Sequence, residues 1–368
     1  MKRKRVAVIF GGRSGEHVVS LRSAASIMEA IDKDCFEVIP IGITREGAWL
    51  AGADAWLSLW ENRPPREATP AVMLTDPTRP GLLVQSPGSP DKWVHQPVDI
   101  VFPALHGTYG EDGTIQGLFE MSGIPYVGSG VLASSIAMDK VKMKIQFKEH
   151  GLPIAPFIHF YRWEWNNRKD KWEEQVRNKI GYPCFIKPAN LGSSVGITKV
   201  QSNDELAVAV EEALLYDEKV IVESLIEGRE VECSVLGDIE PLASRPGEVI
   251  PCNEFYDYRA KYIDDRSELV IPVELGSKLE SIIRDYSIKA FQAVEASGLA
   301  RVDFFVDSST ETATLLEINT IPGFTSISMY PKLWEASGIS YDELLRQLLE
   351  LAENRFQRRR ELMVSPPE

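Results

Sequence analysis

Two apolar runs near the C-terminal end decide the fold of this chain: RVDFFV at residues 301–306 and LLEINT at residues 315–320. The turn-forming residues DSSTE at 307–311 separate them, so we predict a β-hairpin. Side chains alternate between the two faces of a strand, which places Arg301 beside Asp303 and Glu317 beside Asn319. If the two polar faces coincide, two carboxylates, an amide oxygen and a guanidinium meet within a mostly hydrophobic sheet.

This polar cluster has two chemical interpretations. Buried carboxylates are costly unless they are paired or bind a cation. The oxygen atoms of Asp303, Glu317 and Asn319 suit a hard ion such as Mg²⁺, with phosphates completing its coordination shell. The alternative is a structural salt bridge from Arg301 to its neighbours. One arginine cannot neutralise two acids, so the hairpin favours the metal site.

Length and charge limit the classes of protein to which the chain can belong. Its 368 residues are enough for two or three domains. The formal charge of −14 argues against nucleic acid or an anionic membrane as the main partner, and no apolar run approaches the length of a membrane span. The apolar run at 6–10 is too short for a signal peptide. Four widely spaced cysteines fit buried, reduced thiols of a cytoplasmic protein: Cys35, Cys184, Cys233 and Cys252.

Alternating strand and helix patterns open the chain. We predict an α/β unit with a parallel sheet from strands at 6–10, 37–43 and 98–102 and a helix at 20–31. Eight prolines between Pro64 and Pro97 indicate loops and edge strands. A single helix is predicted at 132–150, followed by a glycine stop signal.

The remaining sequence predicts two α+β regions. The first contains strands at 184–187, 196–200 and 219–223 and a helix at 203–216. The second begins near Glu230 and contains a strand at 231–236, helices at 277–297 and 341–353, and the hairpin.

A glycine-rich loop, GSSVG at 192–196, follows the strand that ends at Lys187. Such a loop can bring backbone N–H groups and hydroxyls close to phosphate oxygens. It is not a Walker A sequence, and by itself an ordinary hairpin turn would explain it equally well. A lysine at the end of the adjacent apolar strand favours phosphate binding over a surface position.

These motifs, taken in order, resemble the ATP-grasp superfamily and, within it, the D-alanine–D-alanine ligase family. The resemblance rests on segments that span nearly the whole chain: GGRSGE at 11–16, HG at 106–107 with GEDG at 110–113, MDK at 138–140, KP at 187–188, GSSVG at 192–196, YDYRAKY at 256–262, RVD at 301–303 and EINTIPGFTS at 317–326. It implies a three-domain ATP-grasp architecture in which a parallel-sheet α/β domain precedes two α+β domains that clasp ATP. The implied domains are residues 1–130, which face the first D-alanine, 131–227, and 228–368, which carry a lid loop and the metal site.

The resemblance also implies a role for each matching position. Asp303, Glu317 and Asn319 would hold two Mg²⁺ or Mn²⁺ ions against the phosphates of ATP. The ATP contacts would come from Lys140, Lys187, Ser193, Ser194, Glu223, Ile226, Glu230 and Lys261, with Glu223 and Glu230 at the adenine and ribose. The substrates would be bound by Glu16, His106, Arg301, Gly323, Ser328 and Met329. Glu16 would hold the ammonium of the first D-alanine, and Ser328 with the N–H of Met329 the carboxylate of the second. The catalytic set would be Glu16, Ser193, Tyr262, Arg301 and Gly323, of which Arg301 and the N–H of Gly323 stabilise an oxyanion. For His106, a structural role and a place near the first carboxylate remain equally open.

The implied activity is ATP-dependent joining of two D-alanines, through a D-alanyl phosphate, to supply D-alanyl-D-alanine for peptidoglycan precursors. A homodimer is implied as well. The alternatives are a D-alanine–D-lactate ligase and another ATP-grasp carboxylate–amine ligase. Tyr262 favours an amine nucleophile, since relatives that use D-lactate typically carry a different residue such as histidine there. Glu16, Tyr262 and Ser328 together favour the D-alanine enzyme over other ligases of the superfamily, and the complete set of metal carboxylates disfavours a regulatory protein without catalysis.

Overall fold

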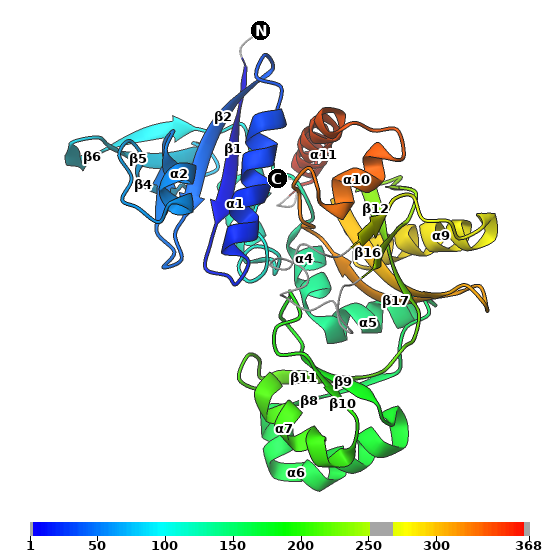
Figure 1. The fold of residues 1–368 in the computed structure, drawn as a ribbon. Helices are drawn as coiled ribbons and strands as arrows, with labels where there is room; N and C mark the ends of the chain where they lie inside the picture. Colours follow the sequence, from blue (N-terminus) through cyan, green and yellow to red (C-terminus); the bar gives the residue numbers. More distant parts are fainter. Residues whose placement is uncertain (1–2, 251–267, 364–368) are drawn as a thin grey trace.

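Three β-sheets, each with its own helices, follow one another along the chain in the computed structural model (Figure 1). The structure describes residues 3–250 and 268–363. Within these ranges no helix combines the length and the apolar character needed to cross a membrane.

The first sheet has seven strands in the order β6-β5-β4-β3-β2-β1-β7. Its strands are β1 (Lys4–Gly11), β2 (Phe36–Ile43), β3 (Trp49–Ala51), β4 (Thr69–Met73), β5 (Gly81–Ser86), β6 (Ser89–Pro97) and β7 (Ile100–Ala104). Strand β1 pairs in parallel with β2 and β7, as predicted, and the proline-rich stretch forms the antiparallel edge strands β4 to β6. At the end of β1, Gly11 has φ +89°, and a Cβ there would lie 2.2 Å from the carbonyl oxygen of Ile43. Only glycine permits this turn, which leads into the segment that carries Glu16.

The helices of this first region cover both faces of its sheet. They are α1 (His17–Ala30), α2 (Ala55–Trp60) and α3 (Thr114–Ser122). The core between α1 and β1 continues into the C-terminal part of the chain, because Phe10 and Leu21 share it with Phe324, Tyr330 and the apolar face of the last helix.

The second sheet has four strands in the order β10-β9-β11-β8. They are β8 (Phe157–Tyr161), β9 (Cys184–Pro188), β10 (Thr198–Val200) and β11 (Lys219–Ser224), accompanied by α6 (Arg162–Gln175), the π-helix η1 (Val176–Ile180) and α7 (Asn203–Ala213). One face packs on these helices around Phe160, Trp165 and Ile186. The predicted strands and the helix at 203–216 are confirmed, whereas β8 and α6 were missed, because the charged sequence RWEWNNRKDKWEEQ of α6 has almost no apolar periodicity.

The third sheet contains the predicted hairpin. Its order is β15-β14-β12-β16-β17, with β13 paired to β12. The strands are β12 (Arg229–Gly237), β13 (Leu242–Ala243), β14 (Gly247–Ile250), β15 (Glu268–Val270), β16 (Gly298–Asp307) and β17 (Thr312–Asn319), and the helices of this part are α9 (Ser277–Ala293), α10 (Met329–Glu335) and α11 (Tyr341–Arg360). Strands β16 and β17 pair in antiparallel fashion, which confirms the hairpin.

The single helix predicted at 132–150 is wrong. Two helices occupy the segment, α4 (Val131–Met138) and α5 (Lys140–Glu149), and the extended backbone of Asp139 separates them. The Asp139 carboxylate accepts hydrogen bonds from the N–H groups of Val141 and Lys142, at 3.0 and 3.1 Å, and so caps α5. Both helices pack against β17, and α5 also reaches the second sheet through Val141.

The expectation of buried thiols holds for Cys184 and Cys233 but is wrong for Cys35, which is exposed. Cys252 lies outside the described residues.

Candidate active site

The polar residues of the hairpin lie opposite one another across the β16–β17 ladder. Asp303 pairs with Glu317 and Arg301 with Asn319, and the register shifts immediately afterwards, between Asp303 and Phe304. Directly paired residues share a face of the sheet. The strands therefore bring together the two carboxylates, the amide and the guanidinium that the sequence placed on two separate faces.

Arg301 forms ion pairs with two buried acids. Its Nε and Nη2 donate to the two carboxylate oxygens of Asp303, both at 2.7 Å, and Nε lies 3.0 Å from Oε2 of Glu232. Burial opposes the charge of the guanidinium, but Asp303 and Glu232 outweigh it and hold the Arg301 pKa well above its ordinary value. The structural salt bridge that the sequence left as an alternative is thus present. Glu232, on β12, is a member of this cluster that sequence reasoning missed, although it lies directly opposite Asp303.

The glycine-rich loop lies against the first turn of the N-terminal region. Ser193 and Ser194 adopt φ of +53° and +58°, and the Ser193 hydroxyl donates to the Glu16 carboxylate. At the base of the loop, Lys140 Nζ donates to the carbonyl of Leu191 at 2.6 Å. The structure therefore brings together Lys140, Ser193 and Glu16, which come from three different parts of the sequence.

Two lysines hold the carboxylate of Glu223. Lys187 Nζ lies 2.5 Å from Oε2 and Lys144 Nζ lies 2.9 Å from Oε1. Burial would raise the Glu223 pKa, but the charges of Lys144 and Lys187 prevail and lower it to about 2. Burial opposes the charge of Lys187, but the contact with Glu223 and the charges of Glu317 and Glu230 prevail and raise its pKa. Lys187 and Glu223 thus connect the second sheet electrostatically to the acidic hairpin of the third.

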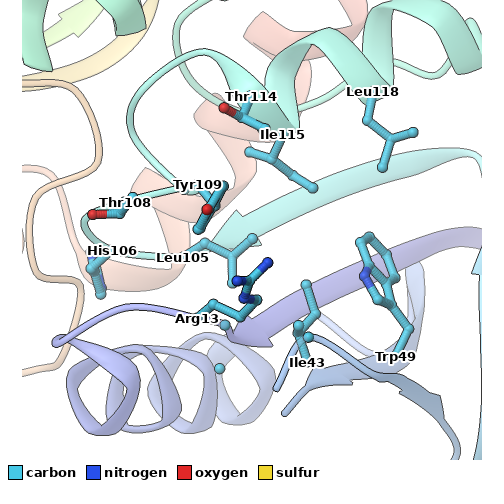
Figure 2. A pocket seen from close by; sticks show the side chains of 14 residues that line it. Arg13, Ile43, Trp49, Leu105, His106, Thr108, Tyr109, Thr114, Ile115 and Leu118 are labelled. Atoms are coloured by element: carbon cyan, nitrogen blue, oxygen red, sulfur yellow. The ribbon is translucent and has the colours of Figure 1, made fainter. Parts of the chain in front are cut away.

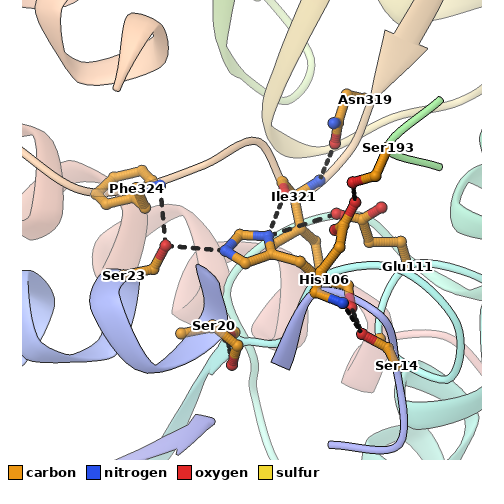
Figure 3. Close-up of polar contacts among 12 residues, drawn as sticks. Ser14, Ser20, Ser23, His106, Glu111, Ser193, Asn319, Ile321 and Phe324 are labelled. Atoms are coloured by element: carbon orange, nitrogen blue, oxygen red, sulfur yellow. Dashed lines mark hydrogen bonds and ion pairs between the residues drawn. The ribbon is translucent and has the colours of Figure 1, made fainter. Parts of the chain in front are cut away.

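His106 links the N-terminal region to the loop after β17 (Figure 3). Its Nδ1 lies 2.9 Å from the carbonyl oxygen of Ile321, and its Nε2 lies 2.9 Å from the hydroxyl of Ser23. The same hydroxyl accepts a hydrogen bond from the N–H of Phe324 at 3.2 Å. These contacts make His106 a structural bridge that fixes the backbone next to Gly323.

Glu111 is a further site residue that sequence reasoning quoted only as part of a motif. Its Oε1 lies 3.6 Å from His106 Nδ1, and ligand atoms of Glu16, His106 and Glu111 lie within 4.8 Å of one another. Burial, followed by the nearby charge of Glu16, raises the Glu111 pKa to about 7 despite the contact with His106. For His106, burial opposes the charged form, but the contact with Glu111 prevails and raises the pKa. Two acids beside a histidine form a site suited to an ammonium group.

The predicted binders of a second substrate lie at the start of α10. Ser328 directly precedes the helix. Its hydroxyl accepts a hydrogen bond from the N–H of Thr325 at 3.1 Å. The same oxygen lies close to Gly323, since a Cβ on that glycine would be 3.2 Å away. Met329 is the first residue of α10, and its side chain is buried against Val249 and Leu333. Its backbone N–H stands at the positive end of the helix dipole.

A pocket of about 210 Å³ lies beside His106 in the N-terminal region (Figure 2). Apolar side chains form most of its wall, and Arg13 extends between Leu105 and Ile43, with its guanidinium 5.1 Å from the ring centre of Tyr109. The lining residues are Gly11, Gly12, Arg13, Ile43, Gly47, Trp49, Leu105, His106, Thr108, Tyr109, Gly110, Thr114, Ile115 and Leu118. Since His106 belongs to both the pocket wall and the Glu16 cluster, the pocket adjoins the acidic Glu16 site.

Two predicted site residues, Lys261 and Tyr262, lie outside the described residues. Ile226 follows the end of β11, and Glu230 lies on β12 opposite Val249 and Phe305.

The fold is that of the ATP-grasp ligases. The structure of the VanG D-Ala:D-Ser ligase from Enterococcus faecalis is similar with a TM-score of 0.85 and 37% identity, covering 95% of this chain and 100% of that one. The D-alanine–D-alanine ligase from Coxiella burnetii is similar with a TM-score of 0.80 and 34% identity, covering 98% and 97% of the two chains.

Family models match at two places, "D-ala D-ala ligase N-terminus" over residues 5–129 and "D-ala D-ala ligase C-terminus" over residues 146–350. The D-alanine–D-alanine ligase of Natranaerobius thermophilus is 50% identical over 353 residues, which are 96% of this chain and 95% of the relative. The chain therefore belongs to the D-alanine–D-alanine ligase family.

Proposed function

We propose that this protein joins two molecules of D-alanine into D-alanyl-D-alanine and converts ATP into ADP and phosphate. The observation that carries the proposal is the convergence of three groups on one region: the acidic hairpin, the lysine-bound Glu223 and the Glu16–His106–Glu111 cluster. Relatives named D-alanine–D-alanine ligase over nearly the full length support the same activity. The dipeptide would enter peptidoglycan precursors.

ATP would lie between the second and third sheets. Glu223 would accept a hydrogen bond from adenine, Ile226 would contact the base and Glu230 the ribose. Lys140, Lys187 and Lys261 would contact the phosphates together with the loop at Ser193 and Ser194. Lysine ammonium groups stabilise the charge that builds up as a phosphoryl group moves.

The oxygen donors of the hairpin fit a divalent cation. Asp303 and Glu317 lie opposite one another, Asn319 adds an amide oxygen, and the ion pair with Arg301 occupies one acceptor position on each oxygen of Asp303. We propose two Mg²⁺ or Mn²⁺ ions here, which when bound would neutralise phosphate charge.

The first D-alanine would bind with its ammonium at Glu16 and its carboxylate near His106. A carboxylate is a poor acceptor for an amine because its leaving group would be an oxide. Transfer of the γ-phosphoryl group gives an acyl phosphate, from which inorganic phosphate can leave.

The second D-alanine would bind through its carboxylate at Ser328 and the N–H of Met329. Its deprotonated amine would attack the acyl carbon and form a tetrahedral oxyanion. The contacts of Arg301 described above use Nε and Nη2, so we assign Nη1 and the N–H of Gly323 to this oxyanion. One such donor contributes about 3–4 kcal/mol to the stability of the transition state. Collapse of the oxyanion expels phosphate and leaves the peptide bond.

The acyl phosphate must be shielded from water. We propose that the loop carrying Lys261 and Tyr262 closes over the site, with Tyr262 joining Ser193 and Glu16. In this proposal residues 1–130, 131–227 and 228–368 are the three domains, and the enzyme is a cytoplasmic homodimer.

The reaction is tested by phosphate release with ATP, Mg²⁺ and each alanine enantiomer, combined with mass detection of the dipeptide. Release that requires D-alanine, with dipeptide formed in equal amount, is the expected result, and turnover with L-alanine alone would refute it. Because one similar structure is of a D-Ala:D-Ser ligase, D-serine and D-lactate are offered as competing nucleophiles. Predominant formation of the mixed product would reassign the second substrate.

A further inference from the structure

Lys144 is a buried lysine that the proposed reaction does not use. The residue is 1% exposed. Lysine is rarely buried without an ionic partner. Its partner is Glu223, at 2.9 Å.

The position of Lys144 is fixed by helix α5. Lys140 and Lys144 lie one turn apart on the same face of the helix, where Lys140 reaches the base of the glycine-rich loop and Lys144 reaches β11. Between them, Val141 packs against Ala189 and Ile221 of the second region. The helix thus presents its two lysines to two parts of the proposed nucleotide site.

Each oxygen of Glu223 has one lysine partner. A carboxylate has about four acceptor positions, so the two ion pairs leave others for a ligand. The charges of Glu317 and Glu230 also act on Lys187. Lys144 therefore gives Glu223 a second cation besides Lys187.

We propose that Lys144 is a positioning residue that holds Glu223 as an ionised, fixed acceptor and thereby makes the nucleotide site selective for a 6-amino purine. The proposal rests on the proposed function in assigning Glu223 to the base. It adds a specificity role for a residue that would not touch ATP.

The selectivity follows from hydrogen-bond chemistry. Adenine presents an amino group at C6, which donates to a carboxylate. Hypoxanthine presents a carbonyl oxygen there, and an ionised carboxylate has no proton to donate to it. Without Lys144, Oε1 of Glu223 would be buried without a cation, which favours protonation or rotation toward Lys187. Either change removes the distinction between the two bases.

The test compares binding of ATP and ITP to the full chain in the absence of D-alanine. Hypoxanthine carries a carbonyl oxygen at C6 and a proton on N1, where adenine carries an amino group and an acceptor nitrogen. Calorimetry is carried out on wild type, K144M and K144Q. We expect ATP to bind about tenfold or more weakly to both variants, the loss associated with one hydrogen bond to a charged group. ITP binding should change much less, so the preference for ATP should fall by a similar factor.

Lys142 provides the matched control. It is exposed on the same helix, and K142M should keep the wild-type preference. Thermal melts identify variants that fold, and K144Q retains a donor for Oε1 if K144M does not fold. A folded K144M or K144Q protein that keeps the wild-type ratio of ATP to ITP affinity, or loses both affinities equally, would overturn the proposal.

Binding is measured apart from turnover so that the two proposals can fail separately. A wild type that binds ATP selectively but makes no dipeptide would refute the proposed reaction and leave the role of Lys144 supported by the variants. A wild type that joins D-alanines, together with a K144M protein that keeps full selectivity for ATP, would support the proposed reaction and refute the role of Lys144.

Discussion

Ser193 and Glu16 are 177 residues apart in the sequence, yet the hydroxyl of Ser193 donates a hydrogen bond to the carboxylate of Glu16. The contact joins the glycine-rich loop of the second sheet to the first turn of the N-terminal sheet. Loop position and recognition of the first substrate are therefore coupled at one carboxylate.

Replacing Ser193 should loosen this contact without unfolding the protein. We expect S193A to lower the kcat/KM for D-alanine about tenfold, the loss of one hydrogen bond to a charged group. Initial rates of phosphate release at varied D-alanine measure the effect. S202A, at the start of α7, is the control, and equal rates for S193A and wild type would contradict the coupling.

The acidic hairpin should be essential for turnover. D303N and E317Q each remove a charge from the proposed cation site, and we expect dipeptide formation to fall at least about a hundredfold. ATP binding should also lose its dependence on Mg²⁺. D307N changes a half-buried aspartate at the end of the same strand and should behave as wild type. Retained turnover in D303N would disprove the metal assignment.

Glu111 should make stability depend on pH. Its pKa in the folded protein is about 7, above the usual value of 4.5. Between these values the folded state keeps a proton that the unfolded state has lost, so the free energy of unfolding falls as pH rises from about 4.5 to about 7. His106 acts in the same direction, because its pKa is raised and its contribution disappears as pH rises through the folded value.

Urea unfolding across this range measures the effect of Glu111. E111Q should remove about 3 kcal/mol of the fall in the free energy of unfolding between pH 4.5 and pH 7. Parallel curves for E111Q and wild type would contradict the raised pKa.

Asp139 should stabilise the protein in two separable ways. It caps α5, and it forms an ion pair with Lys219, a lysine that is largely buried. D139N keeps an oxygen for the cap but loses the charge, whereas D139A loses both. We expect D139A to be less stable than D139N by about 1 kcal/mol, and D139N to be less stable than wild type by about 3 kcal/mol.

Chemical denaturation of the three proteins tests this order. D170N, on the exposed face of α6, is the control substitution. Equal stability of D139N and wild type would mean that Lys219 does not depend on its partner.

Local patterns predicted much of this fold. The hairpin, the parallel strands and the glycine-rich loop each have a signal within a few adjacent residues, such as the alternation around Asp303. The break at Asp139 was missed because both flanking segments favour a helix, and only contacts from distant Lys219 and Ala189 show why the chain turns there.

Only the structure shows which side chains of the site contact one another. The contacts of Glu111 with His106, Glu232 with Arg301 and Lys144 with Glu223 join separate elements, and a single sequence contains no signal for such pairs. A buried lysine has the same local pattern as a solvated one on a charged helix. The resemblance to a family supplied roles for many residues, but not for these partners.

The core shared by α1 and α11 has a consequence for the order in which the protein is assembled during synthesis. Val8 and Phe10 complete their packing with Leu344 and Leu348, which leave the ribosome more than 300 residues later. The larger core of the second sheet, in contrast, is formed by residues between Phe160 and Val222. Domains generally fold as units while the chain is made. The middle of this chain can therefore fold before its beginning does, and the first strand to be synthesised is among the last to be fully covered.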